Sequence, residues 1–256
     1  MKRKAVFMDI DGTLISKGAV SEVVARAIKK ARDEGHMFFI CTGRSKIYLP
    51  QVIRDMDYID GYVMSCGMRC EVGGKTIYHE AFSPEELRDI AEYVCRKGRA
   101  SHFEGIEKIL SINSERRDFS QVSSCEELMA ELGKETVSKI AIDGAHIAED
   151  DPELFDRFEA FDMGHYSDIV RKGVTKATGM QRVLEYIGIP REDCIGIGDG
   201  SNDLPMIKYA GLGVAMGNAP EHVKAEADAV TETCENDGVA VMIERYIFGE
   251  QHACDK

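Results

Sequence analysis

Long hydrophobic runs are missing from this sequence of 256 residues. No stretch approaches the roughly 18 apolar residues that a membrane-spanning helix needs. The N-terminus begins with "MKRK", as a signal peptide does, but its apolar stretch lasts only from Ala5 to Met8 before Asp9 follows. The hydrophobic region of a signal peptide takes about 7–15 residues. We therefore expect a cytoplasmic protein without a membrane partner.

Cysteine pairs at the spacing of metal ligands are also missing. The eight cysteines are scattered, and none belongs to a C-x-x-C pair. The closest two, Cys66 and Cys70 in "CGMRC", have neither a second pair nor a nearby histidine at ligand spacing, so nothing indicates a zinc site. We expect reduced and mostly buried thiols.

The chain has fewer basic than acidic residues. The chain has 32 Lys and Arg against 45 Asp and Glu, a net charge of −13. This argues against nucleic acid or an anionic membrane as the main partner. A small anionic substrate is still compatible, provided that a metal ion or a local lysine reverses the sign at its site.

Short apolar runs flanked by turn residues predict strands buried on both faces, at 4–10, 37–43 and 60–66. Between the first two, residues 21–36 have helical apolar spacing, with Ser21 as a plausible N-cap and Gly35 as a plausible C′ residue. This β-α-β pattern predicts parallel strands joined by a right-handed crossover. The following "EVGGKTIYHE" predicts a hairpin with a Gly-Gly turn.

The C-terminal part repeats this alternation, whereas the middle of the chain is looser. We expect C-terminal helices at 175–190, 201–211, 219–227 and 237–248, and strands at 193–199, 212–218 and 228–232. In the middle we expect helices at 84–98, 125–133 and 151–160, and strands at 108–113, 138–143 and 165–170. The sequence therefore predicts a core formed by 1–81 and 169–256, with an inserted α+β domain at 82–168.

Acidic residues follow two of the predicted core strands, where sites of parallel α/β sheets are found. In "DIDGT", Asp9 and Asp11 point the same way from one strand end, and two close carboxylates need a compensating cation. Mg²⁺ prefers such oxygen ligands. In "GDGSND", Asp199 offers a third carboxylate and Asp203 a fourth, which we expect in the outer shell. The alternatives are an Asp-Gly turn at the first site and a plain helix-start residue at Asp203.

Two other segments, "TGR" and "TK", suit an anion. Thr42 offers a hydroxyl, the backbone near Gly43 offers N–H groups, and Lys176 would reach in from a helix start. An ammonium ~4 Å from a phosphate oxygen contributes roughly 4 kcal/mol at an effective dielectric near 20. Thr42 as a helix N-cap and Lys176 as a surface residue are the alternatives. Carboxylates, a metal and phosphate contacts together favour phosphoryl transfer through an aspartyl-phosphate.

In their order along the chain, "DIDGT", "TGR", "TK" and "GDGSND" resemble the motifs of the haloacid dehalogenase (HAD) superfamily of phosphohydrolases. The tail from "GVAMGNAPEHVK" to "DGVAVMIE" resembles the Cof-type sugar-phosphatase branch. The resemblance covers both outer segments. It implies an α/β fold, in which a Rossmann-like doubly wound parallel sheet (the HAD-like core) carries an inserted α+β cap that selects the leaving group.

The resemblance also implies roles for the acidic residues. Asp9 would be the nucleophile and a Mg²⁺ ligand. Asp11 would be the general acid/base, with its backbone carbonyl on the metal. Asp199 would bind Mg²⁺, and Asp203 would support the metal shell.

For the phosphoryl group, the resemblance implies contacts from Thr42, Lys176 and Asn202, beside the backbone at Gly43. One departure concerns the loop after the third strand, where Cys66 stands in place of the Asn that Cof-type members usually have. The contacts of that loop are therefore not carried over.

We expect a Mg²⁺-dependent phosphatase for small phosphorylated metabolites, with sugar phosphates as the first class to test. The alternatives are a phosphomutase of the same superfamily and a non-catalytic protein that binds metal and ligand. Candidate substrate contacts in the cap, each of which has an ordinary surface role as its alternative, are His102, Glu104, Arg116, Arg117 and His165. The sequence does not indicate an oligomeric state.

Overall fold

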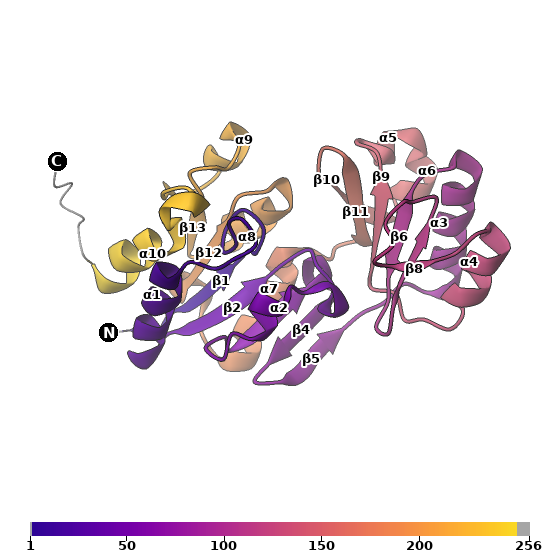
Figure 1. The fold of residues 1–256 in the computed structure, drawn as a ribbon. Helices are drawn as coiled ribbons and strands as arrows, with labels where there is room; N and C mark the ends of the chain where they lie inside the picture. Colours follow the sequence, from indigo (N-terminus) through magenta and orange to yellow (C-terminus); the bar gives the residue numbers. More distant parts are fainter. Residues whose placement is uncertain (1, 250–256) are drawn as a thin grey trace.

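A computed structural model describes residues 2–249 as two lobes, each built on its own sheet (Figure 1). The larger sheet has eight strands in the order β14-β13-β12-β1-β2-β3-β4-β5. These strands are β1 (Ala5–Met8), β2 (Met37–Cys41), β3 (Gly61–Met64), β4 (Arg69–Val72), β5 (Lys75–His79), β12 (Cys194–Gly198), β13 (Leu212–Ala215) and β14 (Ala229–Val230). The six strands from β14 to β3 are parallel, as the sequence predicts.

The strand order of this core sheet reverses at β1. The chain builds outwards from β1 through β2 to β3, and later from β12 through β13 to β14 on the other side. Such a switch point leaves a crevice at the carboxyl ends of the two central strands, because their connections leave towards opposite faces of the sheet. The predicted acidic motifs after β1 and β12 both open into this crevice.

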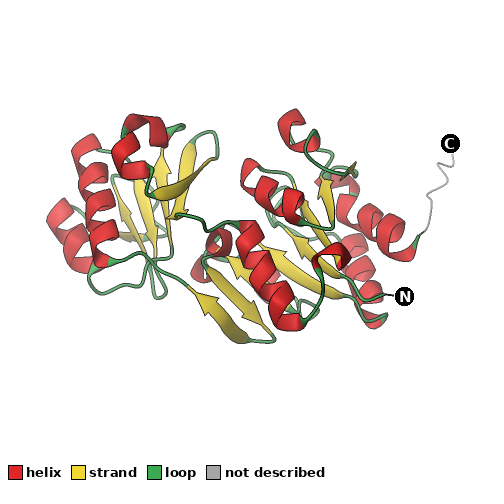
Figure 2. Ribbon diagram, turned by 180° about the vertical axis from the view of Figure 1, so that it is seen from behind, coloured by secondary structure: helices red, strands yellow, loops and turns green. Residues whose placement is uncertain are grey.

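Helices cover both faces of the core sheet, as Figure 2 shows from behind. On one face, α1 (Glu22–Asp33), α10 (Gly238–Ile243) and the π-helical turn Glu244–Phe248 pack against Val6 and Met8. On the other, α7 (Lys176–Ile187) and α8 (Leu204–Tyr209) pack against Ala5 and Phe7. Alternate residues of β1 are thus buried on opposite faces, which explains why the strand is apolar throughout. Shorter helices are α2 (Gln51–Arg54) and α9 (Glu221–Lys224).

Local signals explain where the main core helices begin and end. Ser21 accepts a hydrogen bond from Val23 N and caps α1, and Gly35 follows its end with φ +96°. Thr175 forms a capping box with Thr178, so that α7 begins at Lys176, and Gly188 ends it with φ +70°. These boundaries confirm the predictions for both helices, and the start of α7 directs Lys176 towards the crevice.

The smaller lobe, here called the cap, has a six-stranded sheet in the order β10-β11-β9-β6-β7-β8. Its strands are β6 (Ser101–Glu104), β7 (Ile109–Ile112), β8 (Ser120–Gln121), β9 (Lys139–Asp143), β10 (Phe158–Asp162) and β11 (Tyr166–Arg171). Its helices are α3 (Pro84–Lys97), α4 (Cys125–Leu132), α5 (Ile147–Asp150) and α6 (Pro152–Phe155). The helices lie on the face turned away from the core (Figures 1 and 2).

Two expectations for the cap differ from the structure, and strand β6 lies where no strand was expected. The predicted helix 151–160 is wrong beyond Phe155, because the chain continues as β10, pairs with β11 and buries Phe158 in the cap core. The predicted boundary at residue 168 falls inside β11, so the cap sheet extends to Arg171. In each case long-range strand pairing decides the conformation, and the local pattern does not contain that information.

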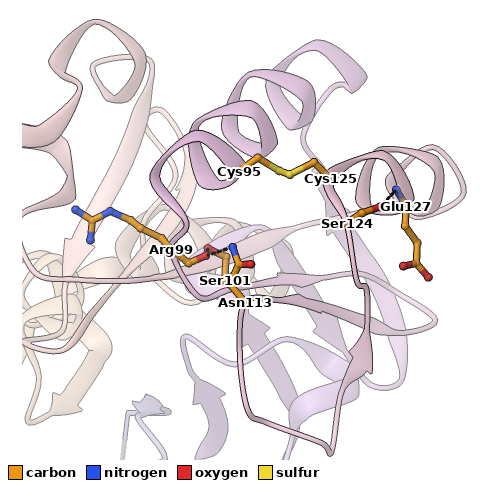
Figure 3. Close-up of a disulfide and its surroundings, with 7 residues drawn as sticks. All are labelled: Cys95, Arg99, Ser101, Asn113, Ser124, Cys125 and Glu127. Carbon is orange, nitrogen blue, oxygen red and sulfur yellow. Dashed lines mark hydrogen bonds between the residues drawn. A yellow bond between two sulfur atoms is a disulfide. The ribbon is translucent and has the colours of Figure 1, made fainter.

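The expectation of reduced cysteines is wrong for two of them. Cys95 near the end of α3 and Cys125 at the start of α4 form a disulfide that spans 30 residues of the chain (Figure 3). Cys41, Cys66, Cys70, Cys194 and Cys234 are free. Cys254 lies outside the described residues. Scattered spacing gave no sign of the pair, because packing of α3 against α4 brings the two together.

Within residues 2–249, no helix has both the length and the apolar character needed to cross a membrane.

Candidate active site

A pocket of about 640 Å³ lies at the carboxyl ends of β1 and β12 and is roofed by the cap sheet. All four predicted motifs meet there. The residues that line it from the core include Asp9, Asp11, Thr42, Gly43, Asp199, Asn202 and Asp203. Lys176 lies directly beneath, where its Nζ contacts Asp9 and Asp203. The structure therefore brings together all the core residues that the sequence proposed for the site.

Three carboxylates form the centre of this pocket. Asp9, Asp199 and Asp203 each offer an oxygen within 4.8 Å of the other two. Lys176 Nζ lies 2.6 Å from Asp9 Oδ1 and 2.5 Å from Asp203 Oδ1, and its side chain is fully buried. The ammonium thus contacts two of the three carboxylates, so the cluster as a whole keeps an excess of negative charge, with Asp9 and Asp203 buried and Asp199 half-buried.

This excess of negative charge raises the pKa values of two carboxyl groups in the cluster. Burial, followed by the charge of Asp203, raises the pKa of Asp9 to about 8 in spite of the neighbouring Lys176. Burial and the same Asp203 charge raise the pKa of Asp199 to about 6. A divalent cation would reverse both shifts, because it favours the ionised carboxylates. Clustered carboxylate oxygens are the donor set that Mg²⁺ prefers, so the residues present fit the predicted metal.

Neighbouring backbone and side chains hold the third carboxylate in place. Asp199 accepts hydrogen bonds from Thr13 Oγ1 at 3.2 Å and from Asn218 Nδ2 at 3.1 Å. Asp203 Oδ2 accepts from the backbone N–H groups of Asp199 at 3.1 Å and Gly200 at 2.8 Å. These contacts support the metal-shell role proposed for Asp203. The sequence analysis did not single out Thr13 or Asn218.

Gly12 allows the two acidic motifs to approach each other. Its φ of +78° suits glycine, and a Cβ at this position would collide with the carboxylate of Asp199. The Asp-Gly pair is therefore part of the site rather than a turn alone.

Asp11 is not part of the three-carboxylate cluster. Its carboxylate is half exposed and forms a bidentate ion pair with Arg44, with Nε–Oδ2 at 2.7 Å and Nη2–Oδ1 at 2.8 Å. The expected convergence of Asp9 and Asp11 side chains therefore does not occur. A contribution of Asp11 to a metal site through its backbone carbonyl remains compatible with this geometry. In "TGR", roles were expected only for Thr42 and Gly43, and the pairing of Arg44 with Asp11 was not predicted.

The "TGR" loop lies beside the pocket. Thr42 Oγ1 accepts from the backbone N–H of Arg44 at 3.1 Å, which is a local turn contact and not the helix N-cap of the alternative interpretation, because Ser45 stands at the N-cap position of the following 3-10 turn Lys46–Tyr48. Thr42 nevertheless lines the pocket beside Gly43. A Cβ on Gly43 would lie 3.2 Å from Asn202 Nδ2, so the loop and "GDGSND" are in close contact. The lack of a side chain on Gly43 thus lets this loop lie against the amide of Asn202.

Cys66 stands where Cof-type members usually have an asparagine, and its backbone is not that of a regular strand. It has φ +53°, is fully buried and donates its backbone N–H to Thr42 O at 3.1 Å. Burial raises the pKa of its thiol to about 12. Cys66 therefore packs against the "TGR" loop as a neutral thiol, with its Sγ 3.4 Å from the position of a Cβ on Gly43.

The cap closes the pocket from above. Of the five candidate substrate contacts, His102, Glu104 and Arg116 line the pocket. Arg116 Nη2 donates to the hydroxyl of Tyr48, a core residue, at 2.9 Å, so this contact bridges the lobes. Arg117 and His165 are not among the lining residues.

This architecture, with an acidic switch point roofed by a second sheet, is that of a capped α/β phosphatase. The family follows from comparison with known proteins. A sequence model described as haloacid dehalogenase-like hydrolase matches residues 6–243, so the chain belongs to this family. The resemblance to the HAD superfamily and its Cof-type branch is thereby confirmed, and the protein is a phosphatase.

Similar proteins agree with this assignment over nearly the whole chain. The 5-amino-6-(5-phospho-D-ribitylamino)uracil phosphatase YitU of Bacillus subtilis (strain 168) is 28% identical, over 94% of this chain and 96% of its own. The solved structure of the HAD subclass IIB sugar phosphatase BT4131 is 31% identical with a TM-score of 0.84, covering 96% of this chain and 99% of its own. BT1666 from Bacteroides thetaiotaomicron, a HAD phosphatase, is 27% identical with a TM-score of 0.84, covering 96% and 95%.

Proposed function

We propose that this phosphatase is Mg²⁺-dependent and hydrolyses small phosphorylated metabolites, sugar phosphates first among them, through an aspartyl-phosphate at Asp9. The observation that carries the proposal is the position of Asp9, a buried carboxylate at the switch point that lies against Lys176 and faces the pocket. The activity of the similar sugar phosphatase and of YitU supports small phosphorylated substrates.

In this mechanism Asp9 attacks phosphorus, the bond to the leaving oxygen breaks, and Asp11 gives that oxygen a proton. Asp11 then takes a proton from the water that hydrolyses the aspartyl-phosphate. Thr42, Asn202 and the backbone at Gly43 would hold the phosphoryl oxygens, because they surround the exposed side of Asp9 in the pocket. Lys176 adds its positive charge from below.

Asp9, Asp199 and Asp203, with the backbone carbonyl of Asp11, would hold the metal. When bound, Mg²⁺ neutralises the carboxylates and the phosphoryl oxygens so that their mutual repulsion falls. The chain's own part is to keep the three carboxylates together, which it does through Lys176 and the hydrogen bonds to Asp199 and Asp203. A cytoplasmic location and the absence of nucleic-acid partners stay predictions.

The test is release of inorganic phosphate from an aryl phosphate and from a panel of sugar phosphates, with Mg²⁺ and with EDTA. We expect Mg²⁺-dependent release that Asp9→Asn abolishes, while Asp33→Asn on the exposed surface of α1 leaves it unchanged. Borohydride reduction during turnover should convert Asp9 to homoserine, since the acyl phosphate is reduced to an alcohol. Full activity of Asp9→Asn would refute the mechanism, and transfer to a second hydroxyl, seen by phosphorus NMR, would indicate the phosphomutase.

A further inference from the structure

The cap sheet presents a polar face to the pocket and an apolar face to its helices. Along β9, Ile140 and Ile142 belong to the cap core, whereas Lys139 lines the pocket. Asp168 of β11 lines it too, while its neighbour Ile169 belongs to the core. Strand alternation therefore aims Lys139 and Asp168 at whatever the pocket contains beyond the phosphoryl group.

These two residues form a buried ionic cluster with Glu104. Lys139 Nζ lies 2.8 Å from Glu104 Oε1 and 3.0 Å from Asp168 Oδ1. All three are nearly buried, with exposed fractions of 5%, 3% and 2% for Lys139, Glu104 and Asp168. One ammonium here serves two carboxylates, so the cluster carries a net negative charge.

The two carboxylates are not equivalent. Glu104 Oε2 also accepts the backbone N–H of Ser45 in the core at 3.1 Å, so Glu104 ties the cap to the loop that carries Thr42. Asp168 has a single side-chain partner among the described residues, the ammonium of Lys139 at 3.0 Å from Oδ1. A carboxylate has about four acceptor sites, so Asp168 can accept a further hydrogen bond from a ligand that supplies a donor.

The cluster also lies next to the proposed phosphoryl-binding loop, where the leaving group of a bound phosphate ester would be. A Cβ on Gly43 would be 3.2 Å from Asp168 Oδ2 and 3.2 Å from Asn202 Nδ2. Asp168 thus adjoins the proposed phosphoryl-binding loop on its cap side. A group bound to Asp168 would belong to the part of the substrate next to the phosphate ester.

From this geometry we infer that Asp168 and Lys139 form a subsite for a hydroxyl group of the leaving group, and that they determine specificity for hydroxylated substrates. A hydroxyl both donates and accepts, which matches a carboxylate oxygen and an ammonium 3.0 Å apart. This inference rests on the proposed function, and it names the substrate group that the cap sheet recognises.

Competing groups fit this subsite less well. A second phosphate or a carboxylate would meet the net negative charge of the cluster, and an alkyl chain would offer Asp168 no further hydrogen bond. An ammonium would satisfy Asp168 but would face Lys139. Of these groups, only the neutral hydroxyl suits both partners.

The experiment compares sorbitol 6-phosphate with n-hexyl phosphate, which share a six-carbon chain and a phosphate and differ in hydroxyl groups. The wild-type protein should have the higher kcat/KM for the polyol phosphate. Asp168→Leu should lower that preference about 10- to 100-fold, as expected for a lost hydrogen bond to a charged group. Most of the change should be in KM for the polyol, with turnover of n-hexyl phosphate kept, and Asp168→Asn should retain part of the preference.

These variants leave Lys139 paired with Glu104, so neither creates an isolated buried charge. Asp156→Asn, which removes a negative charge from the exposed surface of the cap at a residue that does not line the pocket, is the matched control and should leave the preference unchanged. Equal losses on both substrates, or no preference in the wild-type protein, would overturn the subsite alone. No phosphate release from any compound of the wider panel would overturn the proposed function, and this inference with it.

Discussion

Replacing the buried lysine of the active site tests the electrostatic account of the cluster most directly. Lys176→Met keeps a side chain of similar length but removes the ammonium that lies 2.6 Å from Asp9 and 2.5 Å from Asp203. Removing one partner of a buried ion pair costs about 3–5 kcal/mol, because the other partner is left charged and out of water. Proton uptake by the carboxylates limits the loss to this range instead of letting the costs add.

Mg²⁺ should restore part of that stability in the variant. The three carboxylates, all within 4.8 Å of one another, become more negative without Lys176 and should bind a divalent cation more tightly. A ligand that binds only the folded state at 100 times its Kd stabilises it by about 2.7 kcal/mol. We therefore expect a loss of about 3–5 kcal/mol in EDTA and a loss smaller by at least about 1 kcal/mol in saturating Mg²⁺.

The cap offers a matched control for this experiment. Lys139 is also buried between two carboxylates, Glu104 and Asp168, but no third carboxylate of residues 2–249 gathers with them as a metal-ligand group. Lys139→Met should lose a similar amount of stability, and Mg²⁺ should not restore it. Unfolding in urea is followed by far-UV circular dichroism, since the chain has no tryptophan. Equal losses of Lys176→Met with and without Mg²⁺ would refute the reasoning.

Three further predictions follow from the same contacts. In EDTA, the folded protein keeps a proton on Asp9 up to pH about 8 and on Asp199 up to pH about 6, whereas both groups lose their protons near pH 4 in the unfolded chain. The folded state therefore binds more protons in this range, so its stability should fall as the pH rises from about 4 to about 8. Urea midpoints at pH 5 and pH 8 measure this, and Mg²⁺ should flatten the dependence; a midpoint that rises with pH in EDTA would contradict it. Asp11→Asn should reduce turnover of an alkyl phosphate roughly 10²–10⁴-fold and that of 4-nitrophenyl phosphate far less, because nitrophenolate leaves without a proton; equal losses would argue against a general acid. Reduction of the Cys95–Cys125 disulfide, which closes a loop of 30 residues, should destabilise the cap by about 3–4 kcal/mol, with Cys95→Ser/Cys125→Ser as the non-reducible comparison. Unchanged cap unfolding in both would show that the helices hold together without it.

The core and the central acidic residues could be predicted from the chain itself. Local sequence patterns predict the apolar strands, the helix capped by Ser21 and the start of α7 at Lys176, because each of these depends on residues that are close in the chain. The carboxyl ends of parallel strands meet at one edge, which places Asp9 near Asp199 without further information. These parts depend on local periodicity and on one rule of sheet topology.

The cap and the finer contacts of the site depended on the tertiary structure. Strand β10 forms where a helix was expected, because pairing with β11 outweighs the local preference of residues 158–162. The disulfide, the Arg44–Asp11 pair and the Lys139–Glu104–Asp168 cluster join residues separated by 29 or more positions.

Sequence by itself therefore determined which chemical groups this protein has and at which edge of the sheet they gather. Only the tertiary structure decided that Asp11 faces Arg44 instead of the other carboxylates, and that a polar sheet covers the pocket. The physical reason is range: strand and helix patterns repeat over a few residues, whereas charge pairing and burial depend on which distant side chains share the same low-dielectric space.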